Sequence, residues 1–278
     1  MREVVLPEFG VTVSNDRPFT LIAGPCVLED NRSYLEVAER LSELTRELGV
    51  PYIFKASYDK ANRSSIHSYR GFGLEAGLEA LADVRERYKV PVLTDVHSPE
   101  EARRAAKVVD VLQVPAFLCR QTDLVTAVAQ TGRPANIKKG QFISPPEVGN
   151  IITKFAESGG KQLIITERGT TFGYNNLVVD MRGFSQLKSF DVPVCFDATH
   201  SVQLPGGGGD RSAGQREFVV PLTRSALAQG IAAVFWEVHP HPEEALSDGP
   251  NMIPLGEMAH LLQEMKALDG FVKSKERS

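Results

Sequence analysis

The chain has 278 residues, a length that fits either two average domains or one α/β barrel. Hydrophobic residues make up 42% of the chain and charged residues 24%, proportions that exclude a disordered or membrane-spanning protein. The net charge of -4, from 31 basic and 35 acidic residues, argues against general binding to nucleic acid or to anionic membranes, since both need excess Lys and Arg. A local cluster of cations is still compatible with this balance.

The first predicted element is a short hairpin within residues 1–15. Val4–Val13 carries Pro7 and Gly10 in its middle, and we expect it to close one end of the fold. The N-terminal segment has no long apolar run and no small-residue cleavage site. We therefore expect a cytoplasmic protein without a signal peptide or a membrane anchor.

Eight short apolar runs follow, most of them rich in β-branched or aromatic residues, as in parallel strands covered by helices. In chain order they are Phe19–Cys26, Tyr52–Ala56, Val92–Asp95, Val111–Pro115, Ala135–Lys138, Leu163–Glu167, Val194–Asp197 and Ala233–Val238. Helical patterns between them include Ser33–Leu48, Leu74–Tyr88, Pro99–Val108 and Ala213–Ala228. Ser98 and Pro99 are a typical helix start, followed by acidic residues at the positive end of the helix dipole.

Eight strand–helix units over about 250 residues predict an α/β protein with a (β/α)8 TIM barrel and a short N-terminal β-hairpin. A doubly wound sheet is disfavoured, because no G-x-G-x-x-G follows the first strand. No Pro/Gly/Ser-rich linker divides the chain, so residues 1–278 are predicted to form a single domain. The charged tail, Lys273–Ser278, is expected to fray.

The active site of such a barrel forms at the carboxyl ends of the strands, and here nearly every strand ends in a polar or ionisable residue. In chain order these are Cys26, Lys55, Asp95 with His97, Gln113, Lys138, Arg168, Asp197 with His200, and Glu237 with His239. One such residue would carry little information, because strand ends are often solvated. The full set predicts a functional site.

Cations from separate segments are predicted to meet at the barrel mouth: Lys55, Lys60, Arg63, Lys138 and Arg168. Their mutual repulsion must be offset by anions, so phosphate or carboxylate substrates are expected. The segment 55–65 adds an amide and hydroxyls, but it lacks the G-x-x-x-x-G-K-[ST] pattern of an ATP-binding loop. A solvated loop with surface ion pairs is the alternative for this segment.

A second group of residues offers metal ligands: Cys26, His200, Glu237 and Asp248. They would converge at one edge of the barrel, because its eighth strand neighbours both the first and the seventh. The three cysteines are an odd, scattered set, which indicates free thiols without a disulfide framework. Cys119 and Cys195 are expected to be inert. Cys26 considered singly is better explained as a small buried residue than as a ligand, and only the group of four makes the two interpretations equal.

Long strings of the sequence closely resemble one enzyme family. They are FKASYDKANRSS from Phe54, HSYRG from His67, LTDVH from Leu93, QVPAFLCRQTDL from Gln113, NIKKGQF from Asn136, TERGTTFGYNNLVVDMR from Thr166, FDATHSVQ from Phe196 and SDGPNMIPL from Ser247. On these strings the chain resembles the 3-deoxy-D-manno-octulosonate 8-phosphate synthases. KANRSS favours this family over the related 3-deoxy-D-arabino-heptulosonate 7-phosphate synthases, which share the barrel.

The resemblance implies a transferase that condenses phosphoenolpyruvate with D-arabinose 5-phosphate and water and releases inorganic phosphate, for the inner core of lipopolysaccharide. It implies that phosphoenolpyruvate is held by Lys55, Ser57, Lys60, Gln113, Lys138, Arg168 and His200. The residues implied to hold D-arabinose 5-phosphate are Asn62, Arg63, Ser64, His97 and Phe117. Those implied to act in catalysis are Lys138, His200, Asp248 and Lys60.

The resemblance also implies metal dependence and a homotetramer. Metal-independent members of the family carry Asn where this chain has Cys26. The four candidate ligands are therefore expected to bind a divalent ion, which their softness leaves open as Zn, Fe, Mn or Co. Arg63 and Ser64 would reach the substrate across a subunit interface. The Gly-rich segment within residues 204–216 is a candidate lid.

Three other functions stay open at this point. An enzyme like the 3-deoxy-D-arabino-heptulosonate 7-phosphate synthases would use erythrose 4-phosphate. A Schiff-base aldolase would use Lys138 as its nucleophile. A non-catalytic sensor would bind sugar phosphates and release no phosphate.

Overall fold

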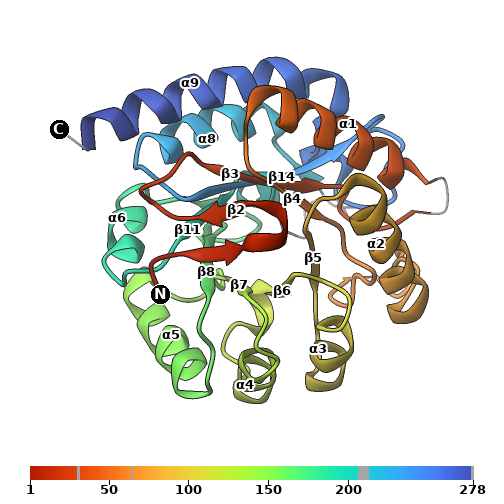
Figure 1. Ribbon diagram of the computed structural model, residues 1–278, viewed down its shortest axis with the longest axis horizontal. Coiled ribbons are helices and arrows are strands. Elements are labelled where there is room, and N and C mark those ends of the chain that lie inside the picture. Colours follow the sequence, from red (N-terminus) through yellow and green to blue (C-terminus); the bar gives the residue numbers. More distant parts are fainter. Residues whose placement is uncertain (30–31, 64, 206–212, 277–278) are drawn as a thin grey trace.

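A closed parallel barrel forms the centre of the computed structural model, which describes residues 1–29, 32–63, 65–205 and 213–276 (Figure 1). Its strands are β3 (Thr20–Gly24), β4 (Tyr52–Lys55), β5 (Val92–Asp95), β6 (Val111–Val114), β7 (Ala135–Lys138), β8 (Leu163–Glu167), β11 (Val194–Asp197) and β14 (Ala233–His239). Each strand pairs in parallel with the next, and β14 pairs with both β11 and β3, which closes the barrel. The predicted (β/α)8 barrel is confirmed.

Helices form an outer ring around these strands (Figure 1). They are α1 (Ser33–Leu48), α2 (Leu74–Tyr88), α3 (Pro99–Ala105), α4 (Thr122–Gln130), α5 (Val148–Glu157), α6 (Arg182–Lys188), α8 (Val219–Leu227) and α9 (Met258–Glu276). In α1, Val37, Ala38, Leu41 and Leu44 are buried at helical spacing, so one apolar stripe packs the helix onto the barrel. The predicted start of α3 is confirmed, because the Ser98 side chain accepts a hydrogen bond from the Glu101 backbone amide at 3.2 Å.

Short elements at the carboxyl ends of the strands build the loops of the barrel mouth. They are α7 (Ala198–Ser201), β9 (Thr170–Thr171), β10 (Leu177–Val178), β12 (Gln203–Leu204), β13 (Ala213–Gly214) and β15 (Ile253–Pro254). The predicted helix Ala213–Ala228 is wrong at its start, because β13 pairs with β12 and α8 begins only at Val219. Pro221 explains the difference, since a proline fits the first turn of a helix and breaks its interior.

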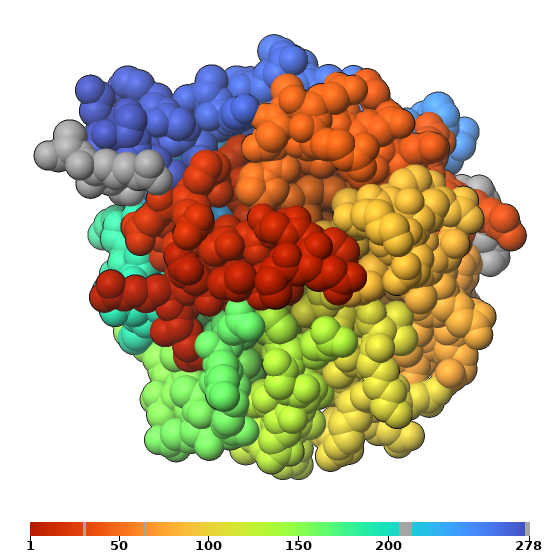
Figure 2. Space-filling view, viewed as in Figure 1, coloured from red at the N-terminus to blue at the C-terminus, as the bar shows by residue number. Residues whose placement is uncertain are grey.

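The N-terminal hairpin closes the other end of the barrel, as predicted. Strand β1 (Val4–Leu6) pairs with β2 (Val11–Val13) in antiparallel register. Their buried side chains form one apolar cluster with inward residues of the barrel: Ile22, Ile53, Leu93, Val111, Ile164, Cys195, Ala233 and Phe235. Figures 1 and 2 view the molecule from this end, where the hairpin lies across the centre. The hairpin therefore excludes water from the barrel interior at the end opposite the carboxyl ends of the strands.

The C-terminal tail differs from the prediction that it frays from Lys273. Helix α9 continues to Glu276, and the buried Lys273 amine lies 2.7 Å from Asp269 and donates to the Ile231 carbonyl at 2.9 Å. These contacts tie the last turns to the loop before β14, which the charged composition of the tail does not reveal. No helix in the described ranges is long and apolar enough to cross a membrane.

Candidate active site and metal centre

A cavity of about 510 Å³ opens at the carboxyl ends of the strands. Ten of the predicted site residues line it: Lys55, Lys60, Asn62, Arg63, His97, Phe117, Lys138, Arg168, His200 and Asp248. Four others, Cys26, Ser57, Gln113 and Glu237, are buried and are not among its lining residues. Ser64 lies outside the described residues, as does most of the predicted lid. The barrel thus gathers residues from nearly every strand–helix loop.

Lys138, at the end of β7, lies in the densest charge cluster of the cavity. Its Nζ lies 2.5 Å from Asp197 Oδ2 and 3.4 Å from His200 Nδ1. Asp197 is wholly buried. Burial alone would raise the pKa of Asp197, but the charges of His200, Lys138 and Arg168 hold that pKa well below its usual range. The aspartate is therefore an ionised counter-ion that holds both the lysine and the histidine.

Lys55 and Lys60 reach toward Glu237 from the β4 side of the cavity. Lys55 Nζ donates to the Cys26 carbonyl at 2.9 Å and to Glu237 Oε1 at 3.1 Å, while Lys60 Nζ lies 3.8 Å from the same oxygen. Burial alone would lower the pKa of Lys60, but Cys26 and Glu237 raise it above its ordinary value. Both amines line a cavity that can therefore bind an anion.

Asp95 places a negative charge among the lysines that line the cavity. Ser57 Oγ donates to its Oδ2 and Gln113 Nε2 to its Oδ1. Burial would raise the pKa of Asp95, but Lys55, Lys60 and Lys138 hold it well below its usual range. Ser57 and Gln113, both expected to contact phosphoenolpyruvate, lie behind Asp95 in the described structure.

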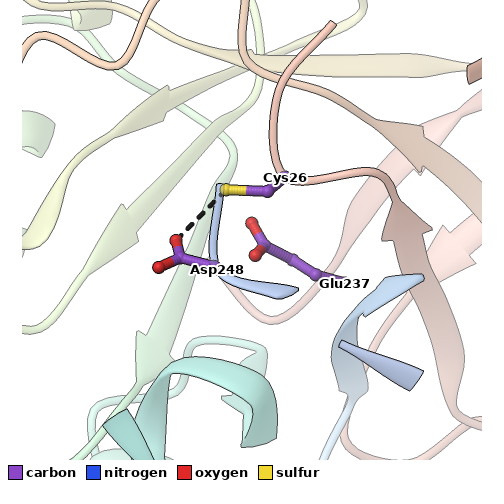
Figure 3. Close-up of side chains that lie close together, drawn as sticks. All are labelled: Cys26, Glu237 and Asp248. Atoms are coloured by element: carbon purple, nitrogen blue, oxygen red, sulfur yellow. Dashed lines mark hydrogen bonds between the residues drawn. The ribbon is translucent and has the colours of Figure 1, made fainter. Parts of the chain in front are cut away.

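Three candidate metal ligands converge beside the lysines. Potential ligand atoms of Cys26, Glu237 and Asp248 all lie within 4.8 Å of one another, and the three side chains point toward a common centre (Figure 3). Cys26 follows β3, Glu237 is on β14, and Asp248 lies in the loop after β14. The predicted convergence of the first and last strands is therefore confirmed for these three residues.

His200 faces the same centre through its second ring nitrogen. Its Nδ1 lies 2.7 Å from Asp197 Oδ2, while Nε2 lies 3.4 Å from Glu237 Oε1 and 3.8 Å from Asp248 Oδ2. The Asp197 carboxylate at Nδ1 orients the ring, so that Nε2 is directed at Glu237 and Asp248. Histidine ligands of metals commonly have this arrangement, with a carboxylate on the far nitrogen.

The residues at this centre fit a divalent cation. Two carboxylates and a cysteine are gathered in a buried space, and Glu237 Oε2 has no hydrogen-bond partner among the described residues. The Cys26 thiol donates to Asp248 Oδ2 at 3.1 Å. Burial, together with Glu237 and Asp248, raises the pKa of this thiol well above its ordinary value. A bound cation would reverse that shift, because it stabilises the thiolate.

Backbone features at two positions shape the centre. A β-carbon at Gly24 would collide with the Lys55 carbonyl, so only glycine lets the end of β3 approach β4 this closely before Cys26. Asp248 adopts a left-handed conformation with a φ of 52°, which Asp tolerates better than most residues. The loop thereby turns this carboxylate toward Cys26.

Gln203, at the start of β12, connects the cations to the metal ligands and was not predicted as a site residue. Its Oε1 accepts from Arg168 Nη2 at 2.7 Å, and its Nε2 donates to Asp248 Oδ1 at 3.2 Å. Arg168 Nη1 is buried and donates no hydrogen bond within the described residues. The guanidinium is therefore held on one side and has a donor left on the other, as an anion-binding arginine needs.

The residues expected to hold the second substrate lie at the outer part of the cavity. Arg63 Nε donates to the Tyr69 carbonyl at 3.3 Å, and Phe117 is 55% exposed. His97 Nδ1 lies 3.0 Å from Glu101 Oε2, which also accepts from the His97 backbone amide. These residues therefore lie around the cavity rim.

Sequence reasoning noted Asp95 and Asp197 as strand ends but gave them no role. Each follows an apolar run as Lys138 does, so the position alone could not separate a counter-ion from a substrate contact. Gln141 and Gln203 line the cavity from loops that carry no strand signal. Only their place within the strings QF and SVQ of the resembling family could have indicated them.

Comparison with known proteins gives the same picture along nearly the whole chain. The model of the DAHP synthetase I family matches residues 3–274. The chain belongs to this family. It is 57% identical over 264 residues to a 2-dehydro-3-deoxyphosphooctonate aldolase of Dichelobacter nodosus, with 95% of each chain covered. Proteins of the same name from Trichlorobacter lovleyi and an Azoarcus species are each 56% identical, covering 95–96% of this chain and 96–97% of theirs.

These family members carry the eight-carbon name rather than the seven-carbon one. The resemblance to 3-deoxy-D-manno-octulosonate 8-phosphate synthases is thereby confirmed, since that is the same enzyme under its alternative name. The family match over residues 3–274 extends over both ends of the barrel, so it includes the cavity loops as well as the hairpin.

Proposed function

We propose that this chain is a 2-dehydro-3-deoxyphosphooctonate aldolase that joins phosphoenolpyruvate to D-arabinose 5-phosphate. Water enters the reaction, and the products are 3-deoxy-D-manno-octulosonate 8-phosphate and inorganic phosphate. The observation that carries the proposal is the cation-lined cavity, in which Lys55, Lys60, Lys138 and Arg168 come from three separate strand ends. Curated relatives of the same name, more than half identical to this chain, support the choice of substrates.

The four cations account for the first substrate. Phosphoenolpyruvate carries a phosphate and a carboxylate, and both would lie against the ammonium groups and the remaining Arg168 donor. Asp197 limits the movement of Lys138 and His200, so their donors are oriented before the substrate arrives. The enol carbon can then attack the pentose aldehyde, after which water adds at C2 and the C–O bond to phosphate breaks.

We further propose that Cys26, His200, Glu237 and Asp248 hold a divalent metal ion. When bound, the ion would supply Lewis-acid polarisation of the aldehyde or an activated water. Two observations support this assignment: Glu237 Oε2 has no hydrogen-bond partner among the described residues, and His200 Nε2 is directed at Glu237 and Asp248. The thiolate and imidazole suit Zn, Fe, Mn or Co better than Mg or Ca.

The second substrate and the assembly are part of the same proposal. Asn62, Arg63, His97 and Phe117 at the rim would bind D-arabinose 5-phosphate, together with Ser64. Arg63 and Ser64 would act across the interface of a homotetramer. Exposed Phe117 and Phe142 beside the mouth support a partner on this face, since water would otherwise cover large aromatic surfaces. Sedimentation of the protein, compared with an Arg63→Ala variant, measures the assembly and the role of this arginine.

Phosphate release is the decisive experiment. Purified protein is given phosphoenolpyruvate with either D-arabinose 5-phosphate or D-erythrose 4-phosphate, with and without a chelator. Release with the pentose phosphate that stops in chelator is expected. A preference for the tetrose would favour the seven-carbon reaction, and no release with either would favour a sensor. Borohydride should trap no adduct on Lys138, because its amine is paired with Asp197.

A further inference from the structure

A chain of hydrogen bonds crosses four neighbouring strands directly beneath the cavity. Its members are Asp95 on β5, Gln113 on β6, Asn136 on β7 and Thr166 on β8. Asp95 pairs in register with Gln113, and Gln113 pairs in register with Asn136, so the three side chains leave the strands at one height. Asn136 and Thr166 are wholly buried, and of the four only Asp95 lines the cavity.

The bonds of this chain all run in one direction. Thr166 Oγ1 donates to Asn136 Oδ1 at 2.6 Å. Asn136 Nδ2 donates to Gln113 Oε1 at 2.8 Å. Gln113 Nε2 donates to Asp95 Oδ1 at 2.5 Å. The side-chain amides of Gln113 and Asn136 therefore both direct their oxygen toward β8 and their nitrogen toward β5.

The ionised carboxylate of Asp95 fixes this direction. A carboxylate can only accept, so Gln113 must turn its nitrogen toward Asp95 and its oxygen toward Asn136. That oxygen needs a donor, so Asn136 must present Nδ2, and its own oxygen is left for the Thr166 hydroxyl. If Asn136 could not donate, the buried Gln113 oxygen would lose its donor, and the bond to Asp95 alone would hold the Gln113 side chain.

We propose that Asn136 is a positioning residue for the condensation, one that holds Gln113 and, through it, the Asp95 carboxylate on the cavity wall. The inference rests on the proposed function. Ser57 holds the other Asp95 oxygen, so Gln113 and Ser57 together set the plane of the carboxylate. Asp95 then offers its remaining lone pairs to substrate hydroxyls or water between the cations. Asn136 itself is not among the cavity-lining residues.

The first test compares two variants that disturb the same layer. Asn136→Leu keeps the side-chain shape and removes the donor to Gln113, while Thr166→Val removes only the hydroxyl at the far end. Thr166→Val leaves the Asn136 oxygen without its donor, whereas Asn136→Leu leaves the Gln113 oxygen without its donor and the Thr166 hydroxyl without its acceptor, so both should lower thermal stability and Asn136→Leu by more. A misplaced catalytic group costs on the order of 100-fold, and we expect that loss in kcat/KM for Asn136→Leu against less than about fivefold for Thr166→Val.

The second test uses Asn136→Asp as a pH-controlled donor. The neutral carboxyl can donate to Gln113 and accept from Thr166, as Asn136 does, but the carboxylate cannot donate. The variant should therefore approach wild-type kcat/KM at low pH and lose activity relative to wild type as pH rises. Two titratable groups face this position along the hydrogen-bonded row: Asp95, beyond Gln113, and Cys195, the register partner of Thr166. Lys138 lies two residues further along β7.

The outcomes separate the two proposals. Equal kcat/KM losses in Asn136→Leu and Thr166→Val, or an Asn136→Asp activity ratio that does not change with pH, would overturn the positioning role. Circular dichroism at each pH shows whether the folded fraction accounts for a change. Absence of phosphate release from the wild-type protein would instead refute the proposed function.

Discussion

The two ends of the barrel interior are built from the same eight strands and differ in almost every other respect. At the hairpin end, side chains such as Ile22, Ile53 and Val111 form a continuous apolar cluster. At the carboxyl end, the next inward positions include Lys55, Asp95 and Lys138, which are buried and charged. The hairpin end therefore stabilises the fold. The carboxyl end lowers the free energy of unfolding, because its ionised groups are held out of water.

The charged end is tolerated because its groups neutralise one another. Asp197 lies against Lys138, Glu237 against Lys55, and Asp95 among three lysines. Breaking a buried ion pair leaves one charge uncompensated and is costly. Substitutions at the mouth should therefore affect both stability and catalysis, while substitutions near the hairpin should affect stability alone.

The largest effect is expected at the proposed metal centre. Cys26→Ala should lose bound metal and metal-supported phosphate release, because the only thiolate of the site is removed. Cys119→Ala, a control at another buried cysteine, should keep both. Metal content by mass spectrometry and phosphate release are the measurements. Full activity of Cys26→Ala in the presence of chelator would contradict the ligand assignment.

Two adjacent buried lysines offer the next comparison. Lys138→Met should lower kcat/KM by about 100- to 1,000-fold, since it removes a preoriented cation from the cavity. Lys139→Met is the matched control, because Lys139 donates to the Gly140 and Ile143 carbonyls and does not line the cavity. Lys139→Met should lower stability and leave most activity in the folded protein. Equal kinetic losses would show that Lys138 has only a structural role.

At the hairpin end, Ile22→Ala should lower the free energy of unfolding by about 2–5 kcal/mol, the usual result of a cavity in a packed core. Its kcat/KM at low temperature should stay at the wild-type value, because Ile22 lies within the apolar cluster at the hairpin end, away from the mouth. Urea unfolding and initial rates measure the two quantities. A large kinetic loss without unfolding would remove the distinction between the two ends.

The pH dependence of stability tests the buried carboxylates of the mouth. Asp95 has a lowered pKa in the folded state, so it stabilises the fold above its unfolded pKa of about 4 and stops doing so as pH falls. Asp95→Asn should therefore flatten the acid loss of stability by on the order of 1–3 kcal/mol. Exposed Asp123→Asn should not. The loss occurs below the unfolded pKa, so urea unfolding at pH 7 and at about pH 2 measures it, and parallel curves would contradict it.

The smallest effect is expected for Gln203→Met. The loss of a hydrogen bond of about 1 kcal/mol to Arg168 should raise the KM for phosphoenolpyruvate about fivefold, with less change in kcat. Exposed Gln121→Met serves as the control. An unchanged KM would mean that Arg168 is held well enough by its surroundings alone.

Much of the fold could be predicted because a buried parallel strand can be recognised from its own short run of apolar residues. Val92–Asp95, Ala135–Lys138, Leu163–Glu167 and Val194–Asp197 have their predicted bounds, since each apolar run stops where the polar loop begins. Predictions failed where a distant contact decides. Ala213–Gly214 pairs with β12, and Lys273 binds the Ile231 carbonyl.

The sequence by itself determined the barrel, the cations at its strand ends and the candidate ligands Cys26 and Glu237, because each follows from a residue type at the end of an apolar run. It could not determine how those residues pair. Asp197 as the partner of both Lys138 and His200, and Asn136 as the donor behind Gln113, depend on strand register around a closed barrel. Register is set by the packing of all eight strands together, so only the tertiary structure decided which charges and amides meet.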